Sequence, residues 1–312
     1  MTPLQITEAT HRFTTHQPGF IRRTPLWKLR GADFGIDCAE VWLKLEQLQT
    51  GGSFKARGML NRLLSNPIPA SGVIVASGGN AGIATAAAAR ELGVRCEVFV
   101  PEVSSPAKRA KLAALGAEVV VTGAAYSDAL QACLARQQQT GALLTHAYDQ
   151  PEVVAGAGTL ALEIEQQAGV PDAVLVSVGG GGLIAGIASW FERRTRVVAL
   201  EPELAPTLYN ARAAGQPVDV AVSGIAADSL GAKRIGGLAW AATQAHVADA
   251  LLLSDESIRA AQLWLWKELK LAVEPAAALP LAALHSGAYL SRKDEKVCLI
   301  ICGANLDPAT LS

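Results

Sequence analysis

The chain is poor in the residues that mark several common classes of protein. Of its 312 residues only 5% are aromatic and 18% are charged, and the formal net charge is -1. A net charge so close to zero favours neither a nucleic-acid-binding surface nor a polybasic membrane patch. We therefore expect the partner to be a small molecule, and neither nucleic acid nor a membrane.

Cysteine is scarce and scattered along the chain. None of the five cysteines forms a Cys-x-x-Cys pair, and their odd number argues against both a disulfide framework and a zinc site. This pattern predicts a reducing compartment, the cytoplasm. The cysteines are Cys38, Cys96, Cys133, Cys298 and Cys302.

The patterns that direct a chain to or across a membrane are not evident either. The stretch from Met1 to Thr15 lacks the apolar run of a signal peptide. Residues 173–190 are uncharged, but the four successive glycines Gly179–Gly182 would break a membrane helix. We therefore expect no secretion signal and no membrane-spanning segment.

Hydrophobic residues, in contrast, make up 50% of the chain, and its length is sufficient for two domains. Short apolar segments alternate with helical stretches, which is typical of parallel sheets joined by crossover helices. The pattern predicts the α/β class, with strands at Val41–Leu45, Val73–Ala76, Glu97–Val100, Glu118–Thr122, Ala142–Thr145, Ala173–Val178, Val197–Glu201, Ala248–Leu252 and Val297–Cys302. The helices expected between them include Ala81–Leu92, Pro106–Leu115, Tyr126–Gln138, Pro151–Ala168 and Leu183–Arg193.

A lone lysine, Lys55, stands in the string Thr50-Gly51-Gly52-Ser53-Phe54-Lys55, where a glycine pair ends an extended segment and a helix begins. A lysine amine condenses with aldehydes, and partial burial favours its reactive free form by lowering its pKa. A single lysine in such a position is more often a solvated residue of a surface helix. Three further segments of the chain fit the nucleophilic interpretation.

The first of these is the glycine run Gly179–Gly182, which follows an expected strand and opens a helix at Leu183. Its backbone N–H groups and the positive end of the helix would bind a phosphate without side chains in the way. Gly180 to Ala185 also satisfies the G-x-G-x-x-A dinucleotide fingerprint, with Glu201 about 20 residues further on. This segment alone is therefore equally compatible with a nicotinamide or flavin cofactor, but a dinucleotide site gives Lys55 no role.

The other two segments are Ser77-Gly78-Gly79-Asn80, between an expected strand and helix, and Cys302, at the end of the last expected strand. Taken alone, the first is compatible with a tight turn in which Asn80 caps the helix. Taken alone, a buried cysteine is usually a small hydrophobic residue.

Together and in this order, the four segments resemble those of the pyridoxal-phosphate enzymes with the tryptophan-synthase β-subunit fold, most closely the serine/threonine dehydratases. The likeness runs from about Arg23-Thr24-Pro25-Leu26 to the C-terminus. It implies pyridoxal phosphate as the cofactor, held in a cleft between two α/β domains. Residues 41–145 would form the small domain, and residues 1–40 and 146–312 the large one.

The resemblance also implies a role for each segment. Lys55 would hold the cofactor as a Schiff base and move the substrate's α-proton, with Phe54 near the ring. Cys302 would face the ring nitrogen, and Asn80 would contact the 3-hydroxyl. The substrate carboxylate would bind at Ser77, Gly78, Gly79 and Asn80, and the phosphate at Gly179, Gly180, Gly181, Gly182 and Leu183.

Two more sites and the assembly are implied by the resemblance. Glu201, Ala205 and Thr207 correspond to the cation site of the dehydratases. Since related racemases have an acid where this chain has the hydroxyl of Thr207, a monovalent ion such as potassium is expected; the alternative is an exposed glutamate at a strand end. Tyr148 would line the substrate pocket, and the protein would form a homodimer.

The implied activity is the deamination of a β-hydroxy amino acid, L-serine or L-threonine, to pyruvate or 2-oxobutanoate. A thiol such as Cys302 is a poor counter-ion for a protonated pyridine, which favours elimination over transamination. The alternatives within the class are a dehydratase for a bulkier or acidic substrate, a β-replacement synthase such as a cysteine synthase, and a racemase. Related racemases carry a serine at the position of Gly78, so this chain should exchange protons on one face of Cα only. Outside the class stand a nicotinamide-dependent oxidoreductase and a non-catalytic binding protein.

Overall fold

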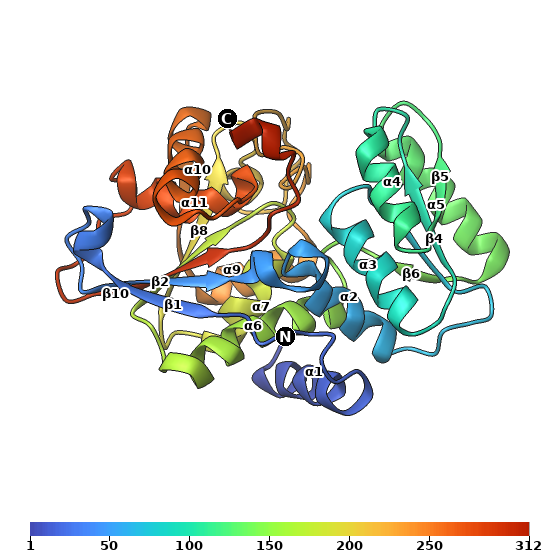
Figure 1. Cartoon of the computed structure of the whole chain (residues 1–312), viewed down its shortest axis with the longest axis horizontal. Helices are drawn as coiled ribbons and strands as arrows, with labels where there is room; N and C mark the ends of the chain where they lie inside the picture. The colour runs from blue at the N-terminus through green and yellow to red at the C-terminus, as the bar shows by residue number, and fades with distance from the viewer. Residues whose placement is uncertain (312) are drawn as a thin grey trace.

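The computed structural model of the protein describes residues 1–311, which form two sheets flanked by helices (Figure 1). The larger sheet has six strands, in the spatial order β1 (Leu26–Arg30), β2 (Glu40–Leu45), β10 (Lys296–Ile301), β7 (Ala173–Ser177), β8 (Arg196–Pro202) and β9 (Val247–Leu253). The smaller sheet has four strands, in the order β5 (Glu118–Val121), β4 (Cys96–Val100), β3 (Val73–Ala76) and β6 (Leu143–Thr145).

Both sheets are parallel except at one edge, where β1 pairs with β2 in the antiparallel sense. The strand β7 is buried along its whole length, as expected for a central strand that is covered on both faces. Figure 1 shows α10 and α11 on one side of the larger sheet and α6, α7 and α9 on the other. The α/β class with two largely parallel sheets is therefore confirmed.

The helices connect the strands as crossovers and cover their faces. They are α1 (Pro3–His16), α2 (Lys55–Leu64), α3 (Asn80–Glu91), α4 (Pro106–Ala114), α5 (Tyr126–Thr140), α6 (Pro151–Ala168), α7 (Gly182–Phe191), α8 (Thr207–Ala214), α9 (Gly237–His246), α10 (Asp255–Leu269) and α11 (Pro275–His285). Short 3-10 turns lie at η1 (Gly31–Phe34), η2 (Glu46–Leu48), η3 (Thr50–Gly52) and η4 (Pro308–Leu311). No helix within residues 1–311 is long and apolar enough to cross a membrane.

Each strand expected from the sequence is present within one residue of its predicted ends. The strand β1 was not expected, because it is a half-exposed edge strand that carries Lys28 and Arg30 among its five residues. The helix expected over Leu183–Arg193 ends earlier, at Phe191, because Glu192 adopts a positive φ of 53° and stops it.

The strand pairing corrects one side of the expected domain boundary. A division at residue 41 would assign β2 to the small domain, but β2 lies between β1 and β10 in the larger sheet. Its apolar residues Val41, Trp42 and Leu43 are buried in the core of that sheet. The end of the small unit at residue 145 agrees with the last residue of β6. The division of the chain into two domains remains a proposal, with the smaller sheet beginning at Val73.

Candidate active site

Lys55 is the first residue of α2, a helix that packs against both α6 and α3 and so lies between the two sheets (Figure 1). Its Nζ donates a hydrogen bond of 2.5 Å to the carbonyl oxygen of Ala147 and lies 5.1 Å from the ring centroid of Phe54. Burial lowers the pKa of the Lys55 amine to about 8, while the nearby Cys302 and Glu274 oppose that shift. Lys55 is therefore neither a solvated surface lysine nor a fully charged one.

A buried network of charges that we did not predict holds the first turn of this helix. Arg57, two residues after Lys55, donates to both oxygens of Glu46 at 2.7 and 2.8 Å and to Glu163 at 3.0 Å. Lys44 contacts the other oxygen of Glu163 at 2.5 Å and also donates to the carbonyl oxygen of Thr24. Each buried charge thus faces an opposite charge, which offsets the cost of removing it from water. The network links β2, α2 and α6 beneath the lysine.

The glycine run lies between β7 and α7, as expected. Gly181 has a φ of +87°, and a Cβ there would lie 2.5 Å from the Cβ of Ala239. A Cβ at Gly180 would lie 2.3 Å from the ring of Tyr148. Within residues 1–311 the backbone N–H groups of Gly180 and Gly181 donate to no protein acceptor. The turn therefore presents free donors at the N-terminus of a helix, in space that side chains would fill.

Tyr148 lies against this turn, half-buried, and its hydroxyl is 3.4 Å from the carbonyl oxygen of Arg234. Burial raises the pKa of its phenol to about 12. The next residue, Asp149, accepts hydrogen bonds of 3.0 Å from the N–H groups of both Gly237 and Leu238 at the start of α9. The segment that carries Tyr148 is thus fixed to the larger sheet's helices, close to both Lys55 and the glycine run.

The segment Ser77-Gly78-Gly79 follows β3 and leads into α3, whose first residue is Asn80. The N-cap of this helix is Gly79, so the interpretation of Asn80 as a capping residue is wrong. Its side chain instead reaches Glu274, at 2.9 and 3.0 Å, and Asn305, at 2.5 Å. Both partners belong to segments adjoining the larger sheet, so Asn80 joins the two halves of the molecule.

Cys302 follows β10 directly and is a buried free thiol, 3% exposed. Burial raises its pKa well above the usual value, so the thiol stays protonated. Its carbonyl oxygen accepts a hydrogen bond of 3.0 Å from the N–H of Phe54, which fixes the distance between this strand and Lys55. The hydroxyl of Ser53, beside the same strand end, is buried without a hydrogen-bond partner in the described residues.

Glu274 was missed from the sequence, because a glutamate before a proline has no distinguishing pattern. It lies at the start of α11 and is 3% exposed. Burial raises the pKa of its carboxyl group, and hydrogen bonds from Asn80 and Ser229 oppose that shift. A Cβ at Gly303 would lie 2.7 Å from one of its oxygens, so the carboxylate packs directly against the chain after Cys302.

Glu201, Ala205 and Thr207 are brought together at the end of β8. Glu201 is fully buried, so the alternative of an exposed glutamate is wrong. Its carboxylate accepts hydrogen bonds of 2.7 Å from the N–H groups of Leu208 and Tyr209, in the first turn of α8, and one of 2.8 Å from the hydroxyl of Thr207. The N–H of Thr207 lies 3.1 Å from the carbonyl oxygen of Ala205. Burial raises the pKa of Glu201 to about 7.

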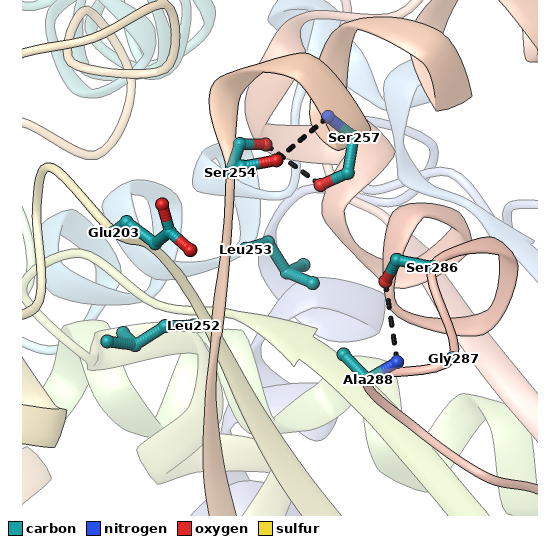
Figure 2. A pocket seen from close by; sticks show the side chains of 8 residues that line it. All are labelled: Glu203, Leu252, Leu253, Ser254, Ser257, Ser286, Gly287 and Ala288. Atoms are coloured by element: carbon teal, nitrogen blue, oxygen red, sulfur yellow. Dashed lines mark hydrogen bonds between the residues drawn. The ribbon is translucent and has the colours of Figure 1, made fainter.

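Two surface cavities lie outside this cluster. One, of about 320 Å³, is shown in Figure 2 and is lined by Glu203, Leu252, Leu253, Ser254, Ser257, Ser286, Gly287 and Ala288. The other contains several arginines, of which Arg194 and Arg196 are already paired with Glu165 and Asp249. Neither cavity includes a residue that the sequence predicts for the site.

The residues brought together fit pyridoxal phosphate. A buried amine with a lowered pKa can bind an aldehyde, and the free N–H groups of Gly180 and Gly181 can bind a phosphate. The protonated thiol of Cys302 can face a neutral ring nitrogen, and the amide of Asn80 can contact a ring oxygen. Phe54, beside the lysine amine, supplies an apolar surface. Contacts connect these groups through Ala147, Tyr148 and Glu274.

Comparison with known proteins agrees with this assignment. The family described as pyridoxal-phosphate dependent enzyme matches residues 18–303. The L-threonine ammonia-lyase of Geobacter sulfurreducens is 38% identical over 87% of this chain and 69% of that protein.

Two solved structures are also similar to this one. The threonine deaminase of T.th. superposes with a TM-score of 0.89 at 34% identity, over 98% of this chain and 99% of that one. Maize serine racemase superposes with a TM-score of 0.91 at 28% identity, over 99% and 95%. The matched stretch contains Lys55, Asn80, the glycine run and Cys302, and the chain belongs to the family of pyridoxal-phosphate dependent enzymes.

Proposed function

We propose that this enzyme is an ammonia-lyase that converts L-serine to pyruvate and ammonia, or L-threonine to 2-oxobutanoate and ammonia. The observation that carries the proposal is the placement of Lys55. Its amine, with a pKa of about 8, donates to the carbonyl oxygen of Ala147, the residue before Tyr148, whose ring packs against the glycine run. The protonated thiol of Cys302 is a further neighbour of the amine. When bound, pyridoxal phosphate withdraws electrons from the substrate's Cα and so acidifies its proton.

In this proposal Lys55 is the base that accepts the α-proton of the substrate. Because part of the amine is unprotonated at neutral pH, it can take up a proton without a second base. The helix α2, anchored through Arg57, keeps the amine in place while its hydrogen bond to Ala147 is exchanged for contact with the substrate.

The substrate carboxylate would bind the backbone N–H groups of Ser77, Gly78 and Gly79 at the positive end of α3. Cys302 supports the choice of elimination over transamination. Since its thiol is protonated and neutral, it would not stabilise a positive charge on the ring nitrogen of a cofactor held there. Loss of the β-hydroxyl then competes well with reprotonation at other positions.

The rival interpretation is a racemase, because maize serine racemase is similar in structure. Gly78 has no side chain to act on the second face of Cα, and Lys55 supplies one face only. A dehydratase for a bulkier or acidic substrate differs only in the side chain that the cleft admits.

One panel of substrates tests the proposal. The purified holoenzyme is incubated with L-serine, D-serine, L-threonine and 3-hydroxyaspartate, and keto acid, ammonia and the configuration of the remaining amino acid are measured. We expect keto acid and ammonia in equal amounts from L-serine or L-threonine and none from D-serine. Accumulation of D-serine from L-serine would change the assignment to a racemase. Turnover of 3-hydroxyaspartate alone would change the assigned substrate to that amino acid.

We further propose that Glu201, the carbonyl group of Ala205 and Thr207 bind a monovalent cation. The hydroxyl of Thr207 bonds to the carboxylate of Glu201, its N–H bonds to the carbonyl oxygen of Ala205, and the carboxylate is buried. The cation would replace the proton that burial favours on Glu201. Activity should then depend on potassium or ammonium, fall in sodium, and be insensitive to chelators of divalent ions. Full activity of Glu201→Gln without any added cation would contradict the site.

The compartment and the assembly are proposals as well. Within residues 1–311 all five cysteines are buried free thiols, which supports a reducing compartment, the cytoplasm. A homodimer is expected from the resemblance, and sedimentation of the purified protein tests it.

A further inference from the structure

A chain of four polar side chains crosses from one sheet to the other. Lys111 of α4 donates to Oδ1 of Asn305 at 2.5 Å, and Nδ2 of Asn305 donates to Oδ1 of Asn80 at 2.5 Å. Nδ2 of Asn80 then donates to both oxygens of Glu274, at 2.9 and 3.0 Å. The first and third residues belong to helices beside the smaller sheet, and the second and fourth to segments beside the larger one.

The end residues of this series of hydrogen bonds determine which group donates and which accepts at each step. The ammonium of Lys111 can only donate, so the atom of Asn305 that faces it must be the amide oxygen. The nitrogen of Asn305 then faces two acceptors, the carbonyl oxygen of Gly51, at 2.9 Å, and Oδ1 of Asn80. A reversed amide of Asn305 would place its NH₂ against the ammonium and its oxygen against the carbonyl oxygen of Gly51.

The orientation of Asn80 is determined in the same way. Its oxygen must face the nitrogen of Asn305, and its nitrogen must face the carboxyl group of Glu274. Both bonds of that nitrogen go to the two oxygens of one carboxylate, and the two N–H groups of an amide diverge too widely to point at the same carboxylate. One N–H therefore makes both bonds, and no other acceptor is bonded to Nδ2 within residues 1–311. Because Glu274 is 3% exposed and also accepts from the N–H of Asn305 at 3.3 Å, it is held firmly in place.

We propose that Glu274, Asn305 and Lys111 are positioning residues that orient the amide of Asn80, so that its free N–H points to the 3-oxygen of bound pyridoxal phosphate. This inference rests on the proposed function, in which Asn80 contacts that oxygen. A donor at the 3-oxygen favours its ionised form, whereas the oxygen of a reversed amide would favour the protonated form. The three residues thus control the protonation of the cofactor without contacting it.

The ratio of the visible to the near-ultraviolet absorption band of the holoenzyme reports this protonation, and it is independent of turnover. In Glu274→Gln only one acceptor atom remains for Asn80 and Asn305, so the ratio should fall at least about twofold. Lys111→Met should lower it in the same direction by less. The matched control is Lys108→Met, which removes the other lysine of α4 that bridges the halves; it pairs with Asp228 and does not contact Asn80. Its ratio should equal that of the native protein.

A double-variant comparison separates positioning from direct contact. In an Asn80→Ala background, Glu274→Gln should change neither the band ratio nor the dissociation constant of the cofactor any further. An equal change in both backgrounds would overturn the proposal, because Glu274 would then act on the cofactor itself. If Glu274→Gln does not fold, Lys111→Met is the deciding variant, because Lys111 is exposed and its substitution should not impair folding. An unchanged band ratio in Lys111→Met would then overturn the proposal. A native protein that binds no pyridoxal phosphate would instead refute the proposed function.

Discussion

Two glycine turns of this molecule have the same local design and are held in different ways. Gly179–Gly182 follows β7 and Ser77–Gly79 follows β3, and each turn leads into a helix. The first is shaped by packing, since side chains at Gly179, Gly180 and Gly181 would meet Leu230, Tyr148 and Ala239 at 2.3 to 3.0 Å. At Gly79 the nearest atom to an added Cβ is the carbonyl oxygen of Asp228, at 3.8 Å.

The second turn is held by polar contacts from the other half of the molecule. Asn80 is bonded to Glu274 and Asn305, and Lys108 of α4 is paired with Asp228. The turn proposed to bind the phosphate is therefore shaped by packing, whereas the segment proposed to bind the substrate depends on how the two sheets are placed. Hydrogen bonds and ion pairs of this kind break and re-form more readily than the contacts of a packed core.

The largest effect is expected at Lys55. Lys55→Ala removes both the anchor and the proposed base, so activity should fall by at least about a thousandfold. Both turns remain intact, so the cofactor should still bind, without a covalent link. Borohydride reduction followed by mass analysis checks the link, and equilibrium dialysis checks the binding. A reduced adduct in Lys55→Ala would show that another lysine is the anchor.

A pair of alanine substitutions tests the contrast between the turns. Gly181→Ala introduces a side chain at positive φ and within 2.5 Å of Ala239, so it should cost at least about 1 kcal/mol of stability and weaken cofactor binding at least tenfold. Gly79→Ala should change cofactor binding less than about twofold, because nothing lies within ordinary contact distance except one carbonyl oxygen. Denaturant unfolding and fluorescence titration with the cofactor measure both. Similar losses in the two variants would remove the distinction.

The sequence indicates a role for the first turn more directly than for the second. In the proposal the backbone of Gly179–Gly182 binds the phosphate, and a glycine run between a strand and a helix is a pattern that indicates such a role. Asn80, in contrast, is proposed to be oriented by Glu274, Asn305 and Lys111, which are distant in sequence and carry no motif. The pairing of β2 with β10, which moves it to the larger sheet, likewise joins the two ends of the chain, and hydrophobic periodicity contains no information on partners. The buried charges around Arg57 were not predicted, because the sequence does not show which charged side chains are buried in the fold.

A third effect concerns pH. A pKa of about 8 leaves about a tenth of the Lys55 amine unprotonated at pH 7, whereas a lysine at 10.5 would have only about one part in three thousand. The rate at which the cofactor-free protein binds pyridoxal phosphate covalently should therefore rise with pH to a plateau with a midpoint near 8. Because the folded pKa is the lower one, the unfolded chain holds more protons between about pH 8 and 10.5, and Lys55 adds stability as pH rises through that window. Stopped-flow absorbance gives the midpoint, and a midpoint above 10 would contradict the burial of the amine.

The smallest effect is expected at Gly78, in the turn that polar contacts hold. An added Cβ there would lie 3.1 Å from the hydroxyl oxygen of Ser104 and 3.3 Å from Val100, so it points toward the smaller sheet. The hydroxyl of Ser104 is buried without a partner in the described residues. In Gly78→Ser the new hydroxyl should therefore bond to Ser104 after a small shift of that side chain, so the stability should change by less than about 1 kcal/mol and no racemisation is expected.

Removing that partner should release the new hydroxyl. The double variant Gly78→Ser with Ser104→Ala has no acceptor at this position, so the serine can turn toward the cleft and exchange protons on the second face of Cα. Chiral analysis of serine recovered from each reaction compares the two, with Ser104→Ala alone as the control. D-serine from the single variant Gly78→Ser would show that the turn already presents position 78 to the substrate, and that polar contacts with the smaller sheet do not determine its direction.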